Sequence, residues 1–383
     1  MYDVKHIAIE LIRSQVSDYT PECIKLDNKA LTDLMNFAAD QDMTNTISKA
    51  LIEFNMVDDE DAISQLMVEQ YGGILRYQKQ KYATERMCAA FDECGIPYIL
   101  LKGAVIRQYY PQPELRTSSD VDILVKEPDR QSAIDCLKKQ LNCIEKSSHK
   151  NNISYYTDDG VHIELHRSMI DDGYTFSKLF KNPWSYAKHI GGYEYGFSNE
   201  HVYLYHYVHM AKHFFTGGFG IRFVLDSWLL DKNMSVDRAE LNRMLVDGGI
   251  KKFADAVSEL SKVWFEGVGH NGVTAALEKH LFESGIYGNL GNQVVMKERM
   301  NGGRIRYMFK RIFMPISQLK KLYPILDKYP VLYPLYLAKR YRRILKKSRG
   351  KAMYELKAIS TSHPDDLDEL FEKLGMKDNI KRR

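Results

Sequence analysis

The hydrophobic pattern changes period twice along the chain, and this change limits the folds that are open to it. Up to about residue 95 the apolar residues recur at helical spacing, beginning with the stripe from Ile7 to Val16. Between residues 96 and 166 they form short runs that are typical of buried strands. From Asn199 onward the helical spacing returns. The pattern therefore predicts an α+β protein, with a small mixed β-sheet flanked by N-terminal and C-terminal helical regions.

The length of 383 residues suits two or three domains, and composition shifts along the chain suggest four regions. A long helix is expected from Asp59 to Phe91, because Gly95 favours a helix exit and Pro97 cannot continue a helix. The expected regions are residues 1–95 (N-terminal helical), 96–198 (α/β core), 199–300 (helical domain) and 301–383 (basic C-terminal helical region).

The expected sheet has four or five strands. Its candidate strands are Tyr98–Leu101, Asp120–Val125, Cys143–Ser147, Ile153–Thr157 and Val161–Leu165. Short helices are expected at Gly103–Tyr110, Pro128–Leu141 and Pro364–Gly375.

Composition excludes several classes of protein. Hydrophobic residues make up 44% of the chain and charged residues 27%, as in ordinary folded proteins. No uninterrupted apolar run approaches the ~18 residues of a membrane span. Charged residues near the start, such as Asp3 and Lys5, do not fit a signal peptide. The five cysteines form no C-x-x-C pair, so we expect reduced thiols and a cytoplasmic location.

Two aspartates in the second expected strand are the sharpest candidate for chemistry. Side chains alternate along a strand, so Asp120 and Asp122 point to one side while Val121 and Ile123 point to the other. Two carboxylates held together in a buried strand repel each other, and a divalent cation removes that conflict. Oxygen ligands favour Mg²⁺ or Mn²⁺ over Zn²⁺. A strand end with two solvated acids is the alternative interpretation.

A second polar strand face follows at residues 161–166. Alternation places His162, Glu164 and His166 on one side. Glu164 could supply a third carboxylate, either as a metal ligand or as the base that activates a hydroxyl. An exposed strand face is the simpler interpretation, and a zinc site built from the two histidines is a weaker one.

The turn from the first expected strand into a helix contains Lys102, Gly103 and Ala104. Glycine at such a turn lets the backbone approach a phosphate, and Lys102 adds positive charge. Arg107 and Arg116 lie nearby in the sequence. Taken alone the turn is weak evidence, because many strand–helix turns contain glycine.

Together these features resemble the nucleotidyltransferases of the DNA polymerase β superfamily. The resemblance is closer to a bacterial group described as uncharacterised nucleotidyltransferases. It is carried by LLKGAVIRQYYPQPELRTSSDVDILV, HIELH and HYVHMAKHFFTGGFGIRFVLDSWLL, and covers roughly residues 97–230. The resemblance implies a metal-dependent enzyme, using Mg²⁺ or Mn²⁺, that moves a nucleoside monophosphate from a nucleoside triphosphate (NTP, for example ATP) to an acceptor hydroxyl and releases pyrophosphate.

Carried over residue by residue, the resemblance makes Gly103 the phosphate-loop glycine and Asp120, Asp122 and Glu164 the metal-binding catalytic acids. Its other expected nucleotide-binding residues are Lys102, Arg116, Ser119 and Lys212. The chain departs from the superfamily pattern in two places. Ala104 replaces the usual serine at the turn, and Asp120 follows Gly103 by seventeen residues, which is longer than usual. These departures bear on nucleotide choice and efficiency more than on fold.

Downstream, His206, His209 and His213 share one face of an expected helix. Buried, hydrogen-bonded histidines are the favoured interpretation over a direct catalytic role. Arg222 and Asp226 stand four residues apart, and we expect them to form a buried ion pair at the domain interface.

The net charge of +4 hides an uneven distribution. Residues 304–351 contain fifteen Lys or Arg and one acid, so the rest of the chain is acidic. Aromatic residues are interleaved with these Lys and Arg residues. An acidic macromolecule such as a nucleic acid is one candidate partner, and an anionic membrane is another. A folded subdomain whose charges face solvent or the acidic body is the favoured interpretation.

Two other functions remain open at this point. A catalytically weak nucleotidyltransferase-fold binding or regulatory protein, of the antitoxin type, is supported by Ala104. A glycosyltransferase with a metal-binding D-x-D motif is less favoured, because a helical region rather than a nucleotide-binding βαβ unit precedes the motif. The sequence names neither the acceptor nor the preferred base.

Overall fold

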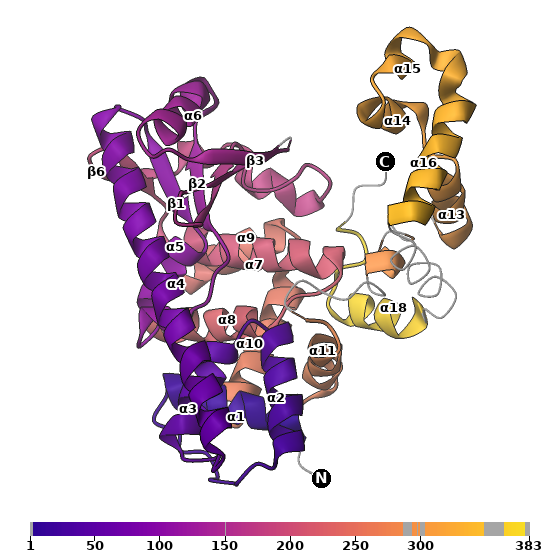
Figure 1. The fold of residues 1–383 in the computed structure, drawn as a ribbon. Helices are drawn as coiled ribbons and strands as arrows, with labels where there is room; N and C mark the ends of the chain where they lie inside the picture. The colour runs from indigo at the N-terminus through magenta and orange to yellow at the C-terminus, as the bar shows by residue number, and fades with distance from the viewer. Residues whose placement is uncertain are drawn as a thin grey trace.

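A computed structural model of the protein describes residues 3–149, 151–285, 293–296, 298, 303–347 and 364–379. These residues combine helices with one mixed sheet, as the change of hydrophobic period predicts (Figure 1). The sheet lies above a layer of helices, and the helices labelled α13 to α16 form a separate lobe to one side.

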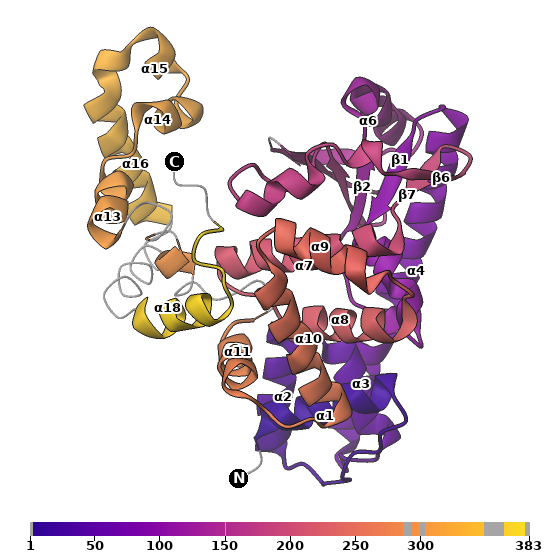
Figure 2. The ribbon, with the colours of Figure 1, turned by 180° about the vertical axis from the view of Figure 1, so that it is seen from behind.

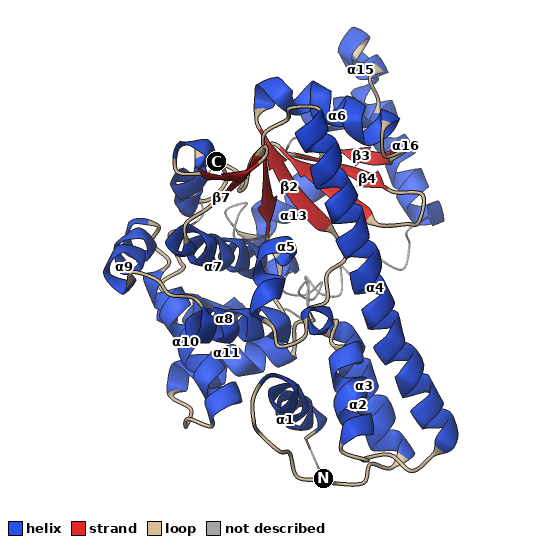
Figure 3. Cartoon of the chain, turned by 90° about the vertical axis from the view of Figure 1, so that its left-hand side faces the viewer, coloured by secondary structure: helices blue, strands red, loops and turns tan. Residues whose placement is uncertain are grey.

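The N-terminal region is helical, with α1 (Val4–Val16), α2 (Asn28–Asp40), α3 (Thr44–Glu53) and α4 (Glu60–Glu93). The long helix α4 begins where predicted, because the Asp59 carboxylate accepts a hydrogen bond from the backbone N–H of Ala62. It ends just before Gly95, whose φ of +67° suits a helix exit. Figure 3 shows α4 running from the region of α3 up to the sheet.

In the described residues the sheet has seven strands, in the order β3-β4-β5-β2-β1-β7-β6. Their bounds are β1 (Tyr98–Leu101), β2 (Val121–Val125), β3 (Ile144–Ser148), β4 (Asn152–Tyr156), β5 (His162–His166), β6 (Lys188–Gly191) and β7 (Glu194–Gly196). The prediction of four or five strands is therefore too low. The two strands that it omits form an edge hairpin, and the wholly exposed side chains of β6 give no apolar pattern.

The two faces of the sheet are covered by different helices. Val121, Ile123 and Val125 pack on one face with buried residues of α4 and of α6 (Arg130–Lys139). Leu124 and Leu101 lie on the opposite face, in the larger hydrophobic cluster. Strand alternation therefore turns Asp122 away from α4 and α6, as the sequence predicts.

The expected helix at Gly103–Tyr110 is a single turn of α-helix, α5 (Gly103–Ile106), followed by a 3₁₀ turn. The 3₁₀ turns found among the described residues are Arg107–Tyr109, Pro113–Leu115, Glu127–Asp129, Thr175–Phe180, Pro183–Ser185 and Pro330–Leu332.

Five further helices lie below the sheet (Figure 2). They are α7 (Asn199–Thr216), α8 (Ile221–Asn233), α9 (Arg238–Asp247), α10 (Lys251–Glu266) and α11 (Gly272–Phe282). Buried side chains of α1, such as Leu11, join those of α8 and α10, such as Trp228 and Leu260, in one hydrophobic cluster. The N-terminal helices and the helices after the sheet thus share a core, and the four-region division stays a prediction.

The C-terminal helices are α13 (Arg304–Ile312), α14 (Ile316–Leu322), α15 (Ile325–Lys328), α16 (Tyr333–Lys347) and α18 (Pro364–Lys373). The last helix returns to the body, where Phe371 stacks on Phe214 with ring centroids 4.6 Å apart. Residues 348–351 of the basic segment lie outside the described residues. No described helix combines the length and the apolar character needed to cross a bilayer. All five cysteines are free thiols.

Candidate active site

The turn between β1 and α5 has an unusual backbone. Lys102 has φ +50° and ψ −115°, a conformation that side-chain-bearing residues rarely adopt. Gly103, which follows, is buried, and a Cβ there would lie 2.8 Å from Arg116 Nη1 and 3.3 Å from Ser118 Oγ. Packing within the protein therefore requires a glycine at this position, and the approach of a phosphate, which the sequence suggested, stays a prediction.

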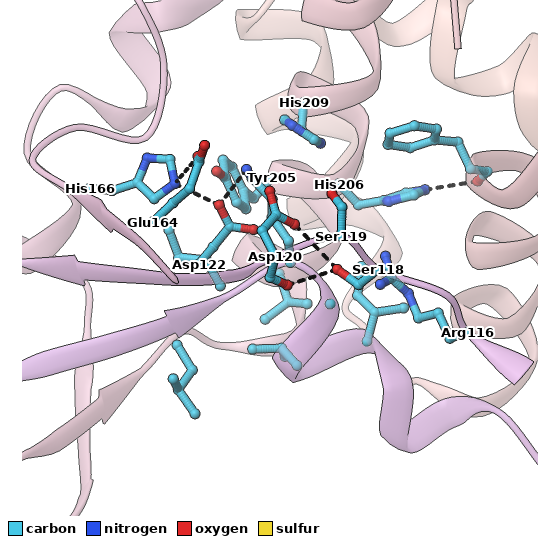
Figure 4. A pocket seen from close by; sticks show the side chains of 18 of the residues that line it. Arg116, Ser118, Ser119, Asp120, Asp122, Glu164, His166, Tyr205, His206 and His209 are labelled. Carbon is cyan, nitrogen blue, oxygen red and sulfur yellow. Dashed lines mark hydrogen bonds and ion pairs between the residues drawn. The ribbon is translucent and has the colours of Figure 1, made fainter. Parts of the chain in front are cut away.

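The three expected acids come from two neighbouring strands. β2 and β5 are parallel, and their register places Asp122 opposite Glu164. Asp120, His162 and Glu164 each have one possible ligand atom, and these three atoms lie within 4.8 Å of one another. The same holds for Asp122, Glu164 and His166. Figure 4 shows Asp120, Asp122 and Glu164 gathered at one wall of a pocket. The structure thus brings together the acids that the sequence placed about forty residues apart.

Asp122 is 2% exposed and is neutralised by two neighbours. Lys102 Nζ donates to its Oδ1 at 2.7 Å, and His166 Nε2 lies 2.6 Å from the same oxygen. Burial would raise the pKa of Asp122, but the Lys102 charge and the His166 hydrogen bond hold it well below its ordinary value. Burial likewise opposes the charged forms of Lys102 and His166, yet the carboxylates raise the pKa of both.

The two other acids differ in their electrostatics. Burial raises the pKa of Asp120, and the nearby charge of Asp122 adds to this shift. Glu164 accepts a hydrogen bond from Asn152 Nδ2 at 2.8 Å. Its oxygen also lies 3.3 Å from His166 Nε2, and the His166 hydrogen bond is the largest cause that lowers the pKa of Glu164 to about 2.

These groups line a cavity of about 270 Å³ between the sheet and the helices α7 and α8. All eight residues expected from the sequence line it: Lys102, Gly103, Arg116, Ser119, Asp120, Asp122, Glu164 and Lys212. Aromatic and apolar side chains, among them Phe197, Val202, Tyr205 and Phe223, also line the cavity. The cavity therefore combines a cluster of acids with apolar and aromatic surface.

Three of the four histidines of α7, His206, His209 and His213, also line this cavity. His206 Nε2 lies 2.9 Å from Ser227 Oγ and 3.1 Å from the carbonyl oxygen of Phe223, while His209 and His213 place their Nε2 atoms 3.1 Å apart. Burial lowers the pKa of His206 to about 4 and that of His213 to about 3. His206 is buried, His209 and His213 are half-buried, and all three are hydrogen-bonded and neutral near pH 7, which agrees with the interpretation that the sequence favoured.

The expected ion pair between Arg222 and Asp226 is not formed. Asp226 instead binds Arg116 through two parallel hydrogen bonds, 2.9 and 2.8 Å long, and accepts a third from the hydroxyl of Tyr110 at 2.7 Å. Arg222 Nη1 donates to Asp42 at 3.0 Å and to the Thr117 carbonyl at 2.8 Å. Asp226 and Arg222 each pair with residues far away in the sequence, because two parallel hydrogen bonds from a guanidinium to a carboxylate need a geometry that Arg222 and Asp226, one helical turn apart, do not have. The Arg116–Asp226 pair joins α8 to the segment before β2, and Arg222 joins α8 both to that segment, at Thr117, and to Asp42 of the N-terminal region.

A second cavity of about 290 Å³ adjoins the first. The two share Lys102, Asn152, His166, His209 and Lys212. The remaining lining residues of the second cavity are His149, Asn151, Ser168, Met169, Ile170 and Asp171. Lys212 Nζ lies 3.4 Å from Asp171, at the boundary between the two cavities.

Sequence reasoning missed some contributors to the site. Asn152 and Tyr205 lie in segments where the sequence shows only strand or helix periodicity. No motif identified either residue as part of a site. His166 was placed on the correct strand face, but its pairing with Asp122 depends on the parallel register of β2 and β5, which the sequence does not display.

Residues 27–266 match the family described as "Uncharacterised nucleotidyltransferase". Among solved structures, the chain is similar to the antibiotic-resistance factor ANT(2'')-Ia, with 14% identity and a TM-score of 0.33 over 48% of this chain and 96% of that chain. No curated protein matches the sequence significantly.

Proposed function

The chain belongs to the uncharacterised nucleotidyltransferase family, and we propose that it transfers a nucleoside monophosphate from an NTP to an acceptor hydroxyl. In this reaction the acceptor oxygen forms a bond to the α-phosphorus, and the bond from that phosphorus to the β-bridging oxygen breaks. Pyrophosphate leaves with the electron pair, and the hydroxyl proton passes to solvent. The observation that carries the proposal is the convergence of Glu164 with Asp120 and with Asp122 in one cavity.

The donor set of the cavity fits a hard divalent cation. Asp120, Asp122 and Glu164 supply carboxylate oxygens, which Mg²⁺ and Mn²⁺ prefer. His162 Nε2 is buried without a hydrogen-bond partner and lies 3.9 Å from Glu164, so it offers a further donor that suits Mn²⁺. When bound, such an ion supplies charge stabilisation to the phosphate oxygens.

The basic residues of the cavity divide into two groups. Arg116 is held by the buried carboxylate of Asp226, and Arg222 is held by Asp42 and the Thr117 carbonyl, so both support the cavity walls. Lys212 is one-third exposed, and its ion pair with Asp171 is long at 3.4 Å. We therefore assign Lys212 as the main contact to the triphosphate, with Lys102 as a second cation beside the acids.

Glu164 fits the role of metal ligand better than that of general base. Its pKa of about 2 makes the carboxylate a poor acceptor for the proton of a hydroxyl near pH 7. The Asn152 amide and the His166 imidazole also orient its oxygens, as outer partners of metal ligands commonly do.

The two adjoining cavities suggest how two substrates meet. The first cavity is lined by aromatic and apolar side chains such as Phe197, Tyr205 and Phe223, against which a nucleoside can pack, so we assign it to the NTP. The second is lined mainly by polar side chains and opens on the same acids through Lys102, Asn152 and His166. We assign it to the acceptor.

Calorimetric titration tests the proposal. Each of the four NTPs is titrated into the protein with and without Mg²⁺ or Mn²⁺, and the same is done for Asp120→Asn and for the control Asp135→Asn, which alters an exposed carboxylate of α6. We expect metal-dependent NTP binding that Asp120→Asn abolishes and the control keeps. A UDP-sugar that binds while every NTP fails would instead indicate the glycosyltransferase alternative.

The reaction type is tested with labelled nucleotide. The protein is incubated with a cell extract and NTP labelled at either the α- or the γ-phosphate. We expect the α-label to enter a product and the γ-label to appear in pyrophosphate. Orthophosphate as the sole labelled product would contradict the proposed reaction.

Two observations favour a second candidate, a non-catalytic binding protein on this fold. Asp122 is already neutralised by Lys102 and His166, so the buried acid does not by itself require a metal ion. Ala104 also lacks the hydroxyl that the superfamily usually presents at this turn. Failure of every nucleotide to bind in the calorimetric series would support this candidate.

A further inference from the structure

The lobe formed by α13 to α16 exposes an unusual number of large apolar side chains. Nine of the nineteen exposed large hydrophobic side chains in the described residues lie between Phe309 and Leu335. They are Phe309, Ile312, Phe313, Ile316, Leu322, Ile325, Tyr329, Val331 and Leu335. Folded proteins seldom keep such a concentration of apolar surface in water unless it meets a partner.

Four of these side chains form a corner where α13 meets α14. Phe309 and Phe313 are 63% and 49% exposed, and their ring centroids lie 4.8 Å apart. Ile312 lies between them in sequence, and Ile316 begins the next helix. The Tyr341 hydroxyl donates to the Ile312 carbonyl, so α16 is held against this corner. The apolar patch is therefore built on packed helices.

Positive charge surrounds the same corner. Arg306 and Lys310 are exposed on α13, one turn from Phe309 and Phe313, and Arg342 and Arg343 are exposed next to Tyr341 on α16. Residues 303–347 contain thirteen Lys or Arg and one acid, Asp327, which pairs with Lys320 in the same lobe. The lobe therefore carries a large excess of positive charge, and several of its basic side chains are exposed.

The lobe does not turn this surface toward the rest of the protein. Leu319 and Leu326 are fully buried, so α14 and α15 have a small core of their own. Figures 1 and 2 both show α13 to α16 standing apart from the sheet and from α7 to α11. The positive charges and the apolar corner consequently face solvent together.

The apolar side chains distinguish between two anionic partners. Proteins bind single-stranded nucleic acids with Lys and Arg side chains and with aromatic rings that stack on the nucleobases. Here aliphatic side chains such as Val331, 82% exposed, and Leu335, 63% exposed, outnumber the aromatic ones. Aliphatic side chains give no stacking surface, but they insert readily at the boundary between lipid headgroups and acyl chains.

We propose that the α13–α16 lobe docks on the surface of an anionic lipid membrane. Phe309, Phe313 and their aliphatic neighbours enter the boundary between headgroups and acyl chains, while the exposed Lys and Arg side chains contact lipid phosphates. The lobe lies on the bilayer without crossing it. This inference is independent of the reaction proposed for the cavity.

Vesicle flotation with the full chain tests the proposal. One vesicle population is phosphatidylcholine alone, and the other is equal parts phosphatidylcholine and phosphatidylglycerol. We expect the protein to float with the anionic vesicles and to remain unbound with the neutral ones. At about 1 kcal/mol per basic residue, Arg342→Glu with Arg343→Glu lowers binding by at least about thirtyfold.

The apolar part needs its own variants. Phe309→Asp with Phe313→Asp removes the corner, while Val246→Asp changes an exposed apolar residue of α9, outside the lobe, by the same chemistry. We expect only the first to abolish flotation, with unchanged circular dichroism in both. All these side chains are exposed, so the variants are expected to fold.

Three outcomes would overturn the proposal. The first is no flotation with anionic vesicles. The second is flotation that Phe309→Asp with Phe313→Asp leaves intact, because the apolar corner would then play no part. The third is salt-sensitive binding of fluorescent single-stranded oligonucleotides, lost in the arginine variants, without vesicle binding; it would assign the lobe to nucleic acid.

Discussion

The ammonium of Lys102 lies 2.7 Å from a carboxylate oxygen of Asp122, at the point where the two cavities meet. Lys102 reaches this position from a backbone conformation that costs on the order of 1–3 kcal/mol. The ion pair offsets that strain in the free protein. A divalent cation bound at Asp122 would take over the neutralisation and release Lys102 toward the phosphates of the donor.

Replacing this lysine tests the relationship. In Lys102→Met the buried Asp122 loses one of its two neutralising partners, so we expect the free energy of unfolding to fall by about 3 kcal/mol. Urea denaturation without metal measures this loss. Added Mn²⁺ is expected to restore more stability to the variant than to the parent protein, because the vacated place beside the carboxylate favours the ion.

The control is Lys139→Met, which breaks an exposed ion pair with Asp135 on α6. Such surface pairs contribute between 0 and about 1 kcal/mol, so the control should unfold almost as the parent does. If Lys102→Met and Lys139→Met gave the same urea midpoint, the Lys102–Asp122 pair would contribute nothing measurable to the free energy of unfolding.

The Arg116–Asp226 pair holds the segment before β2 against α8. The two side chains are 6% and 0% exposed, and two parallel hydrogen bonds join them. We expect Arg116→Met to lower the free energy of unfolding by about 3–5 kcal/mol, because Asp226 is left buried and charged. The double variant with Asp226→Leu should regain much of that loss. A double-mutant cycle by urea denaturation measures the coupling, and additive single effects would show that the residues act separately.

Much of the fold could be predicted because it depends on local patterns. The first five strands were predicted to within one residue, since alternation and short apolar runs mark them directly. The strands at Lys188–Gly191 and Glu194–Gly196 were missed, because an exposed edge hairpin has no buried face to impose alternation. The start of α4 was predicted from Asp59, a local capping signal.

The site shows where local patterns stop being informative. Alternation placed Asp120 and Asp122 on one side, but nothing local showed that Lys102 and His166 neutralise Asp122. The incorrect pairing of Arg222 with Asp226 has the same origin. Helical spacing predicted a partner four residues away from Asp226. The buried carboxylate instead pairs with Arg116, 110 residues earlier in the chain, because the planar guanidinium donates two parallel hydrogen bonds to it.

Gly103 gives a third prediction. In Gly103→Ala the new Cβ meets Arg116 Nη1 at 2.8 Å, and that guanidinium cannot retreat without losing Asp226. We expect a loss of about 1–3 kcal/mol in the free energy of unfolding. Gly173→Ala is the matched control, because no atom lies within 4 Å of the added Cβ there. A Gly103→Ala protein as stable as Gly173→Ala would show that the turn tolerates a side chain, and would leave the approach of a phosphate as the explanation of the glycine.

The buried histidines of α7 predict how stability depends on pH. Burial lowers the pKa of His206 to about 4, below the ordinary value near 6.5 that applies when the chain is unfolded. Between these values the unfolded chain binds a proton that the folded protein does not, so stability falls as pH decreases from 6.5 toward 4. His206→Gln should reduce this slope by about 1.4 kcal/mol per pH unit in urea denaturation curves recorded across the window. His189→Gln, which alters an exposed ring, is the comparison. An equal slope in parent and His206→Gln would mean that His206 is protonated in the folded protein, and its contacts with Ser227 and Phe223 would then need a different arrangement of protons.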